Sequence, residues 1–342
     1  MRTFARSLAL AAVIATAVAG CAPSPVTGAT AAGTPATELT LVGFAVPKAA
    51  HDAAQAAFAL TPDGAGAAWG TSYGASGDQS RAIASGLPAD IVHVSLDDDV
   101  TRLVDSGDVS ATWADAPHGG ILSHSVVVLV VREGNPKSIT GWDDLLRDDV
   151  SIITPNPGSS GSARWNILAA YGSVLANGGT REDGQDYLRG FFANVASLPG
   201  SGRDATTAFT AGTGDVLISY ENEAILARQH GEPLEYVVPA TTLLIENPGV
   251  VTTNAPQQAQ DYLDFVRSPD GQRIFAASGF RPLDDALSVE NIPGAMNPTD
   301  PFPQPTTLQT ITGDFGGWEQ VNATFFGDDG LVTAIQNEAG KN

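Results

Sequence analysis

The sequence predicts an α/β fold divided into two lobes. Apolar, β-branched runs alternate with segments of helical apolar spacing along most of the 342 residues. This alternation is typical of sheets covered by helices, and the length allows one large or two medium domains. An apolar fraction of 43% is ordinary for a globular protein. In folds of this class, ligands bind beyond the carboxyl ends of strands, where the turns into helices gather.

The first part of the chain contains three predicted strands and a helix. ELTLVGFAV (38–46) predicts a strand, and the apolar spacing of AAHDAAQAAFAL (49–60) predicts the helix after it. ADIVHVSL (89–96) predicts a second buried strand. SHSVVVLVVREG (123–134) predicts a third, because its β-branched content is high.

The second part repeats the order of strand then helix. SIITPNPG (151–158) predicts a short strand, and ARWNILAAYGSVLANGG (163–179) predicts a helix ended by its two final glycines. GDVLISYENEAILARQHG (214–231) shows the same order, and APQQAQDYLDFVRS (255–268) predicts an amphipathic helix. Residues 313–340 predict a strandless segment and a last helix, which we expect to pack on the first lobe without a ligand role.

The N-terminus has the features of an export signal. MRTFAR carries two arginines, and LALAAVIATAV (8–18) is an eleven-residue apolar stretch, so residues 1–20 predict a signal peptide. VAGC (18–21) resembles a bacterial lipobox, in which cleavage leaves Cys21 as a lipidated N-terminus; a signal peptide followed by a chance cysteine is the alternative. Cys21 is the only cysteine, and residues 21–38 predict the lipidated residue and a flexible tether.

The charge balance restricts the partners of the chain. It contains 38 acidic and 17 basic residues, and without residues 1–20 the formal net charge is −23, since 15 basic residues remain. Such a surface repels nucleic acid and anionic membranes. Any anion must therefore be bound by local geometry, against an unfavourable overall field.

Three turns rich in glycine and serine precede predicted helices, at 71–83, 156–166 and 198–209. A helix start offers unpaired N–H groups and the positive end of the helix dipole, and glycine lets the backbone approach a ligand closely. NPGSSGSARWN (156–166) is therefore a candidate anion site. The alternative is that Ser159 or Ser160 merely caps the helix.

Signals of catalysis, nucleotide binding or metal binding are weak. The chain has neither a GxSxG elbow nor GxxxxGK[ST], and no GxGxxG follows a strand. Its five histidines lie singly in the sequence, without an HExxH pair. Asp97, Asp98 and Asp99 predict a solvated loop or a helix start, with calcium binding as a weak alternative. We expect no cofactor, no metal and no enzyme activity; an esterase or phosphatase with Ser160 as nucleophile is the alternative.

Several stretches are similar, in order, to those of one family: SYGASGDQSRAI with SGLPADIVHVSLDDDV, GNPKSITGWDDLL, ITPNPGSSGSARWNILAAYG, GDVLISYENEAIL and SPDGQRIFAASGFRPL. The chain thereby resembles the sulfate-binding proteins that serve sulfate/thiosulfate ABC importers, especially their actinobacterial lipoprotein branch. The resemblance implies a bilobal periplasmic-binding-protein-like fold of type II with crossover strands. Residues 39–125 plus 246–342 would form lobe 1, and residues 126–245 would form lobe 2.

The resemblance also implies which residues bind the ion. The family holds dehydrated sulfate with N–H groups at helix starts, a serine hydroxyl and an indole N–H. Matched motif by motif, the ligand-binding residues would be Ser76, Ser160, Gly161, Ser162, Gly202 and Tyr220. Arg164 and Arg203 would anchor the peptide units of the turns without touching the ion.

Two departures affect selectivity. Many members have an aspartate where this chain has Ala45, and a tryptophan where it has Tyr220. Sulfate carries no proton at neutral pH, so its ideal site offers donors only, whereas hydrogen phosphate benefits from an acceptor. Sulfate, with thiosulfate as an additional ligand, is thus the expected ligand, and molybdate or phosphate is the alternative. Iron(III) is disfavoured because Tyr220 stands alone, and a sensor or adhesin of this fold stays open. The partners implied are a membrane permease and an ATPase.

Overall fold

The computed structural model describes residues 37–341 of the chain. The predicted signal peptide, Cys21 and most of the predicted tether lie outside these residues. Thr37 and Glu38, which the prediction assigned to the tether, already belong to the first strand. Among the described residues, every helix is too short or too polar to cross a membrane.

One sheet runs through the described chain, with the strand order β2-β1-β3-β9-β4-β7-β5-β6. In addition, β10 (Thr307–Gln309) pairs with β9 (Thr241–Val251), and β8 pairs with β4 (Ile121–Arg132). One half holds β1 (Thr37–Phe44), β2 (Ala67–Gly74) and β3 (Ile91–His93). The other half holds β5 (Ile152–Ile153), β6 (Val195–Ser197), β7 (Val216–Tyr220) and β8 (Leu234–Val237). Below, lobe 1 means the half with β1–β3 and lobe 2 the half with β5–β8.

Two long strands connect the halves. β4 (Ile121–Arg132) runs from lobe 1 to lobe 2, pairing first with β9 and then with β7 and β8. β9 (Thr241–Val251) returns in the opposite direction and reaches β3. Ten of the twelve residues of β4 are buried, as expected for a strand covered on both faces. These are the two crossover strands that the fold class requires.

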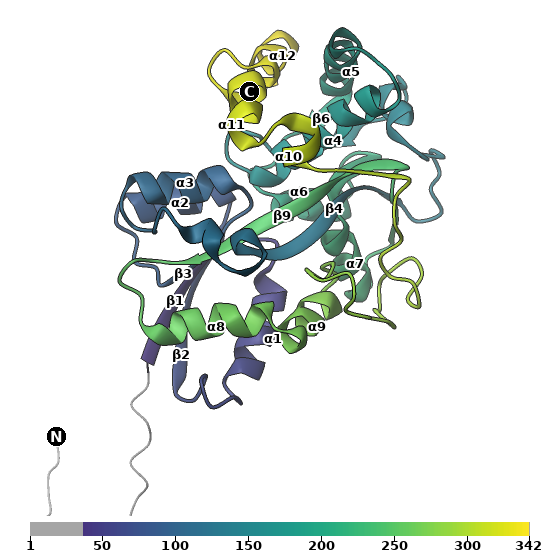
Figure 1. Cartoon of the computed structure of the whole chain (residues 1–342). Helices are drawn as coiled ribbons and strands as arrows, with labels where there is room; N and C mark the ends of the chain where they lie inside the picture. Colours follow the sequence, from purple (N-terminus) through teal and green to yellow (C-terminus); the bar gives the residue numbers. More distant parts are fainter. Residues whose placement is uncertain (1–36, 342) are drawn as a thin grey trace, which may run out of the picture. The chain divides into compact units, whose positions relative to one another are not determined.

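The strand directions bring the functional ends of the two halves together. β3 is parallel to β1 and antiparallel to β9, while β7 is parallel to β5 and antiparallel to β4. Because β4 is also antiparallel to β9, β3 and β7 run in opposite senses. The carboxyl ends of the strands in each lobe therefore point towards the other lobe, and the turns that follow them meet (Figure 1).

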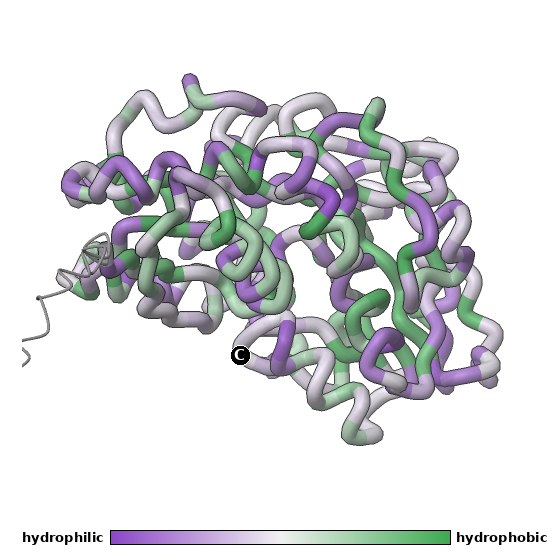
Figure 2. Tube along the Cα trace, turned by 90° about the horizontal axis from the view of Figure 1, so that it is seen from below, coloured by the Kyte–Doolittle hydropathy of each residue, from purple (hydrophilic) through white to green (hydrophobic). Residues whose placement is uncertain are grey.

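Helices follow these carboxyl ends in both halves (Figure 1). Lobe 1 contains α1 (Lys48–Phe58), α2 (Ser76–Ala84), α3 (Asp97–Asp105), α8 (Gln257–Arg267) and α9 (Pro269–Ala277). Lobe 2 contains α4 (Gly161–Ala176), α5 (Arg181–Asn194), α6 (Gly202–Thr210) and α7 (Glu221–Gln229). The hydropathy of the trace alternates along the outer helices, which bury their apolar faces against the sheet (Figure 2).

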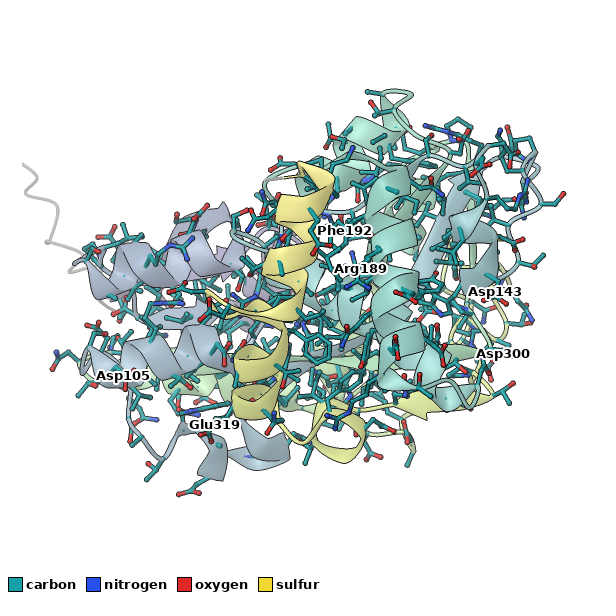
Figure 3. All side chains as sticks on the ribbon, turned by 90° about the horizontal axis from the view of Figure 1, so that it is seen from above. Asp105, Asp143, Arg189, Phe192, Asp300 and Glu319 are labelled. Atoms are coloured by element: carbon teal, nitrogen blue, oxygen red, sulfur yellow. The ribbon has the colours of Figure 1, made fainter. Side chains whose placement is uncertain are left out.

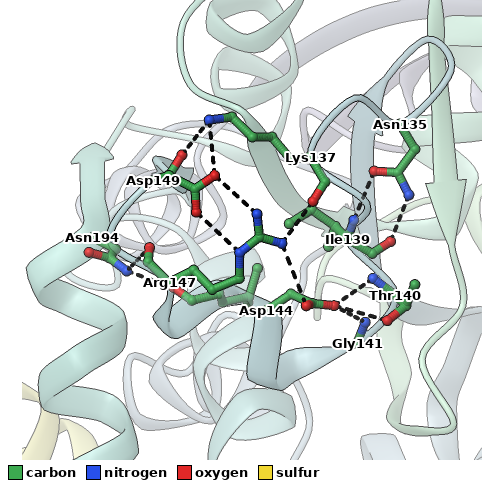
Figure 4. A network of polar contacts seen from close by, with 10 residues as sticks. Asn135, Lys137, Ile139, Thr140, Gly141, Asp144, Arg147, Asp149 and Asn194 are labelled. Carbon is green, nitrogen blue, oxygen red and sulfur yellow. Dashed lines mark hydrogen bonds and ion pairs between the residues drawn. The ribbon is translucent and has the colours of Figure 1, made fainter.

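Side-chain hydrogen bonds fix the connection between β4 and β5 (Figure 4). The Asn135 amide donates to the Ile139 carbonyl at 2.8 Å and accepts from the Ile139 N–H at 2.9 Å. Asp144 accepts from the Thr140 N–H at 2.7 Å and from the Gly141 N–H at 3.2 Å. Each carboxylate or amide thus satisfies backbone groups that no strand pairs, which keeps this connection ordered.

The C-terminal segment differs from the prediction. After β10 (Thr307–Gln309) it forms α10 (Ile311–Phe315), α11 (Trp318–Val321) and α12 (Leu331–Ala339). The Trp318 ring packs edge-on to Trp165 of α4 at 4.8 Å, and Arg189 of α5 lies between α5 and α12, 3.4 Å from Glu338 (Figure 3). The prediction that this segment packs on the first lobe is wrong. The reason is that β10 pairs with Thr241–Leu243, the end of β9 in lobe 2, so the chain has already changed lobes.

Candidate functional site

The predicted ligand residues gather where the two lobes face each other. Ser76 begins α2 in lobe 1, while Gly161 and Gly202 begin α4 and α6 in lobe 2. The Gly77 N–H donates across the interface to the Ser159 carbonyl at 3.2 Å. A Cβ atom on Gly202 would lie only 2.9 Å from the Ser162 hydroxyl, so the starts of α4 and α6 touch. Helix starts from both lobes thus converge on one place.

The starts of α4 and α6 offer free donors. The backbone N–H groups of Gly161, Ser162 and Gly202 have no hydrogen-bond acceptor among residues 37–341. Each group lies in the first turn of a helix, where no intrahelical acceptor exists and the helix dipole favours a negative charge. Ser162 is also buried. Converging N–H groups in a buried place can replace part of the hydration shell of an anion.

Neither serine of the turn caps α4. Ser160 occupies the N-cap position, but its side chain accepts no hydrogen bond from the helix. The Ser159 hydroxyl donates to the Gly200 carbonyl at 2.8 Å. By contrast, Ser201 does cap α6, since it accepts from the Asp204 N–H at 3.1 Å. The Ser160 hydroxyl, 3% exposed as a residue, remains without a partner among the described residues.

The Ser76 hydroxyl is already engaged. It accepts from the Ser95 N–H at 2.7 Å and donates to the Asp99 carboxylate at 2.6 Å. Asp99 is in turn paired with Arg102 at 2.8 Å. In this arrangement the free donor of Ser76 is its backbone N–H, not its hydroxyl. Sequence similarity predicts that Ser76 belongs to the site. It does not predict where the Ser76 hydroxyl proton points, because that depends on Asp99.

Tyr220 lies at the end of β7 and reaches lobe 1. Its hydroxyl is 2.8 Å from the Ser95 hydroxyl, and the side chain is 1% exposed. Burial raises the pKa of Tyr220 to about 12, so the phenol stays protonated and can donate. One proton of the Tyr220 and Ser95 hydroxyl groups is used in the hydrogen bond between them. The second proton can be donated to another acceptor.

The two arginines hold backbone and carboxylates around the turns. Arg164 donates to the Pro157 carbonyl at 3.4 Å and to Asp98 of lobe 1 at 3.2 Å. Arg203 donates to Glu223 at 2.7 Å and to the Val46 carbonyl of lobe 1 at 3.3 Å. Both guanidinium groups thus link lobe 2 to lobe 1.

The sequence did not single out Ser95, yet it is one of the residues through which the lobes make contact. Its carbonyl accepts from the Trp165 indole N–H of lobe 2 at 3.0 Å. A Cβ atom on Gly161 would lie 2.6 Å from both Cβ and Oγ of Ser95. The signal that could have found it is its place two residues after the strand that ends at His93, at a carboxyl end.

Negative charge also gathers at the start of α3. Burial raises the pKa of Asp97 to about 7, and the charges of Glu246 and Asp98 add to the increase. Glu246 lies on β9, 4.0 Å from the His124 ring. Burial also lowers the pKa of His124 to about 4, so His124 is neutral and does not compensate these acids at neutral pH. The ionised Asp97 carboxylate therefore disfavours the folded state at the start of α3.

We expect Asp97→Asn to stabilise the protein at high pH. Because the folded state raises the pKa of Asp97 above its unfolded value, ionisation disfavours folding progressively from about pH 4 to pH 7. The gain in the free energy of unfolding should be about 1–3 kcal/mol at pH 8 after allowance for partial exposure, and should shrink towards zero near pH 4. Urea denaturation at both pH values measures it. Asp105→Asn, at the exposed end of the same helix, is the control, and an equal gain at both pH values for Asp97→Asn would contradict the expectation (Figure 3).

The histidines are arranged differently in space than in the sequence. Among residues 37–341, no group of three or more His, Cys, Asp or Glu side chains could hold a metal ion. The histidines that lie singly in the sequence do not all lie singly in space, because His51 Nε2 is 2.8 Å from His93 Nδ1. The run Asp97–Asp99 forms the first turn of α3, in line with the predicted helix start.

Comparison with known proteins gives a consistent relationship. The sequence pattern of the family described as "Bacterial extracellular solute-binding protein" matches residues 25–281. A sulfate-binding protein of Synechococcus elongatus is 38% identical over 98% of this chain and 96% of its own length. A thiosulfate-binding protein of Pseudomonas aeruginosa is 34% identical over 77% of this chain and 80% of its own length.

Solved structures agree with these relatives. The sulfate-binding protein SubI from Mycobacterium tuberculosis has a TM-score of 0.80 and 43% identity, covering 85% of this chain and 100% of its own. The periplasmic binding protein AfuA from Actinobacillus pleuropneumoniae, with a TM-score of 0.66 and 17% identity, covers 90% of this chain and all of its own, and shares the fold alone. The chain therefore belongs to the bacterial extracellular solute-binding protein family, alongside its sulfate- and thiosulfate-binding members.

Proposed function

We propose that the chain is an extracytoplasmic binding protein that captures sulfate and delivers it to an ABC importer. The observation that carries the proposal is the convergence of helix starts from two lobes, with the N–H groups of Gly161, Ser162 and Gly202 free to donate. The relatives that are named sulfate-binding proteins support the same ligand. Thiosulfate is included because other relatives carry that name.

The donor set favours a fully deprotonated oxyanion. Helix starts and hydroxyl groups supply hydrogen-bond donors, and Ala45 removes one place for an acceptor. The Asp99 carboxylate already accepts from the Ser76 hydroxyl and from Arg102, which reduces its capacity to accept the proton of hydrogen phosphate. About six charge-assisted hydrogen bonds could offset the desolvation of the ion and leave micromolar affinity, about −8 kcal/mol.

The proposed mechanism is capture without chemistry. The lobes open to admit the anion and close to bury it, with β4 and β9 as the connection that bends. The contacts from Trp165 to Ser95 and from Arg203 to the Val46 carbonyl would form on closure. The closed form would then dock on a membrane permease driven by an ATPase, held near it by a lipid on Cys21. No enzyme activity is proposed, because the Ser160 hydroxyl has no histidine partner among residues 37–341.

We expect Ser160→Ala to weaken sulfate binding about 10- to 150-fold, the equivalent of one hydrogen bond to a charged group. The free energy of unfolding should change little, since the hydroxyl supports no other described group. Isothermal titration calorimetry measures the affinity, and urea denaturation measures the stability. Ser159→Ala is the control, because that hydroxyl is bound to the Gly200 carbonyl. Equal affinity of the Ser160→Ala variant and the wild type would remove Ser160 from the site.

A further inference from the structure

A chain of buried polar side chains runs through lobe 1 to the interface between the lobes. Five hydrogen bonds connect its members in series. They join Tyr262 Oη to His51 Nδ1 at 2.8 Å, His51 Nε2 to His93 Nδ1 at 2.8 Å, His93 Nε2 to Ser123 Oγ at 3.2 Å, Ser123 Oγ to Asn247 Oδ1 at 3.3 Å, and Asn247 Nδ2 to the Ser95 carbonyl at 3.0 Å. None of these residues is more than 1% exposed. Such a series is costly to bury unless every member is satisfied.

The chemistry of its end fixes the direction of the whole series. A backbone carbonyl only accepts, so the amide nitrogen of Asn247 faces Ser95 and its oxygen faces Ser123. The single proton of the Ser123 hydroxyl goes to that oxygen, so the hydroxyl accepts from His93 Nε2–H. His93 Nδ1 then carries no proton and accepts from His51 Nε2–H, while His51 Nδ1 accepts from the Tyr262 hydroxyl.

Both histidines are neutral in this arrangement. Burial lowers the pKa of His51 to about 3 and holds the pKa of His93 well below its usual value. If His93 carried a second proton, its Nδ1–H and the Nε2–H of His51 would both be donors facing each other, and the hydrogen bond between the rings would be lost. One placement of protons therefore satisfies every link from Tyr262 to Ser95.

The series ends at Ser95, one of the residues of lobe 1 that contact lobe 2. The Ser95 carbonyl that accepts from Asn247 also accepts from the Trp165 indole N–H of α4. Ser123 lies on β4 and Asn247 on β9, the two strands that connect the lobes. The orientation of the Ser95 carbonyl in lobe 1 thus depends on contacts from a connecting strand and from lobe 2.

We propose that His93 is a positioning residue, which acts through Ser123 and Asn247 to hold the Ser95 carbonyl where Trp165 of the other lobe can donate to it. The series then sets how stable the closed form is, and so how slowly the anion leaves. This inference rests on the proposed function for its ligand but not for its geometry. If the series merely stabilised the core, breaking it would change the free energy of unfolding and leave the lobe contact unchanged.

The test breaks the series in the middle and at its far end. Ser123→Ala removes one oxygen and separates His93 from Asn247, while Tyr262→Phe, the matched control, removes the last hydroxyl and leaves the links from His51 to Ser95 intact. We expect Ser123→Ala to weaken sulfate binding about 3- to 10-fold, mainly through faster dissociation in stopped-flow measurements. Tyr262→Phe should leave the affinity within about twofold, although it also loses a buried hydrogen bond.

A second readout does not depend on the affinity. Hydrogen exchange of the Trp165 indole N–H, followed by NMR on the purified chain at saturating sulfate, should accelerate several-fold in Ser123→Ala and stay unchanged in Tyr262→Phe. His93→Gln, whose amide can still donate towards Ser123, should restore protection closer to wild type than His93→Phe does. Unchanged Trp165 exchange in Ser123→Ala, or equal acceleration in both single variants, would overturn the positioning role. Absence of sulfate binding by the wild type would instead overturn the proposed function alone.

Discussion

Gly161→Ala should bind sulfate about 10- to 100-fold more weakly than the wild type, which corresponds to an overpacking cost of about 1–3 kcal/mol in the closed form. The added Cβ would lie 2.6 Å from Cβ and Oγ of Ser95 and 2.9 Å from Leu96, closer than packed atoms can approach. Because Ser95 belongs to the other lobe, the clash arises only when the lobes close. Alanine is also a good residue for the first turn of a helix, so the unliganded protein should keep its stability.

The control for this variant is Gly141→Ala. Gly141 lies in the connection between β4 and β5, has extended backbone geometry, and a Cβ atom there would meet no atom within 4 Å (Figure 4). Titration calorimetry with sulfate and urea denaturation without it would be done for both variants. Affinity equal to wild type in Gly161→Ala would mean that Gly161 and Ser95 do not approach in the liganded form. A large loss of stability without ligand would mean that the contact belongs to folding and not to closure.

Arg281→Met should lower the free energy of unfolding by about 3–5 kcal/mol, the usual result of leaving one member of a buried ion pair alone. The Arg281 guanidinium contacts both carboxylate oxygens of Glu221, with Nε at 2.6 Å and Nη2 at 3.0 Å. Glu221 begins α7 and is fully buried, while Arg281 is 6% exposed. Burial raises the pKa of Glu221 and the arginine opposes this increase, so the variant should lose less stability at pH 5 than at pH 8.

Two further variants distinguish the effect of breaking this ion pair from the effect of removing any arginine. Arg273→Met removes an exposed arginine that pairs with Asp270 at 2.8 Å on the surface of α9, and should cost less than about 1 kcal/mol. The double variant Arg281→Met/Glu221→Gln removes the unpaired charge and should recover part of the loss. If the two arginine variants lost equal stability in urea denaturation, the buried pair would have no special weight.

Periodicity predicted most of the fold, and its limits have physical reasons. The predicted strands and helices correspond to elements such as β1, α1, β4, α4, β7 and α8, because burial imposes β-branched runs and helical apolar spacing, whereas β2, β9 and α5 were not predicted. The C-terminal helices carry an apolar face as well, which predicts that they pack but not on which surface. Their position depends on three residues, Thr307–Gln309, that pair with the far end of β9. So short a strand has no readable pattern.

The sequence likewise predicted one part of the candidate site and missed another. Turns of glycine and serine before helices identify Ser160, Gly161 and Gly202, because a helix start needs no distant partner to offer its N–H groups. The role of Ser95 depends on residues 70 and 152 positions away, Trp165 and Asn247, and so does not follow from local sequence. The engagement of the Ser76 hydroxyl by Asp99 is also non-local, as it crosses from α2 to α3.

Titration calorimetry of the chain from residue 22 onward, with sulfate and with thiosulfate, phosphate and molybdate in parallel, tests the central claim most directly. We predict micromolar binding of sulfate and much weaker binding of phosphate, because the converging helix starts offer donors and the Asp99 carboxylate is already occupied. Phosphate or molybdate binding more tightly than sulfate, or no heat with any of the four ions, would contradict the account of a sulfate-binding protein.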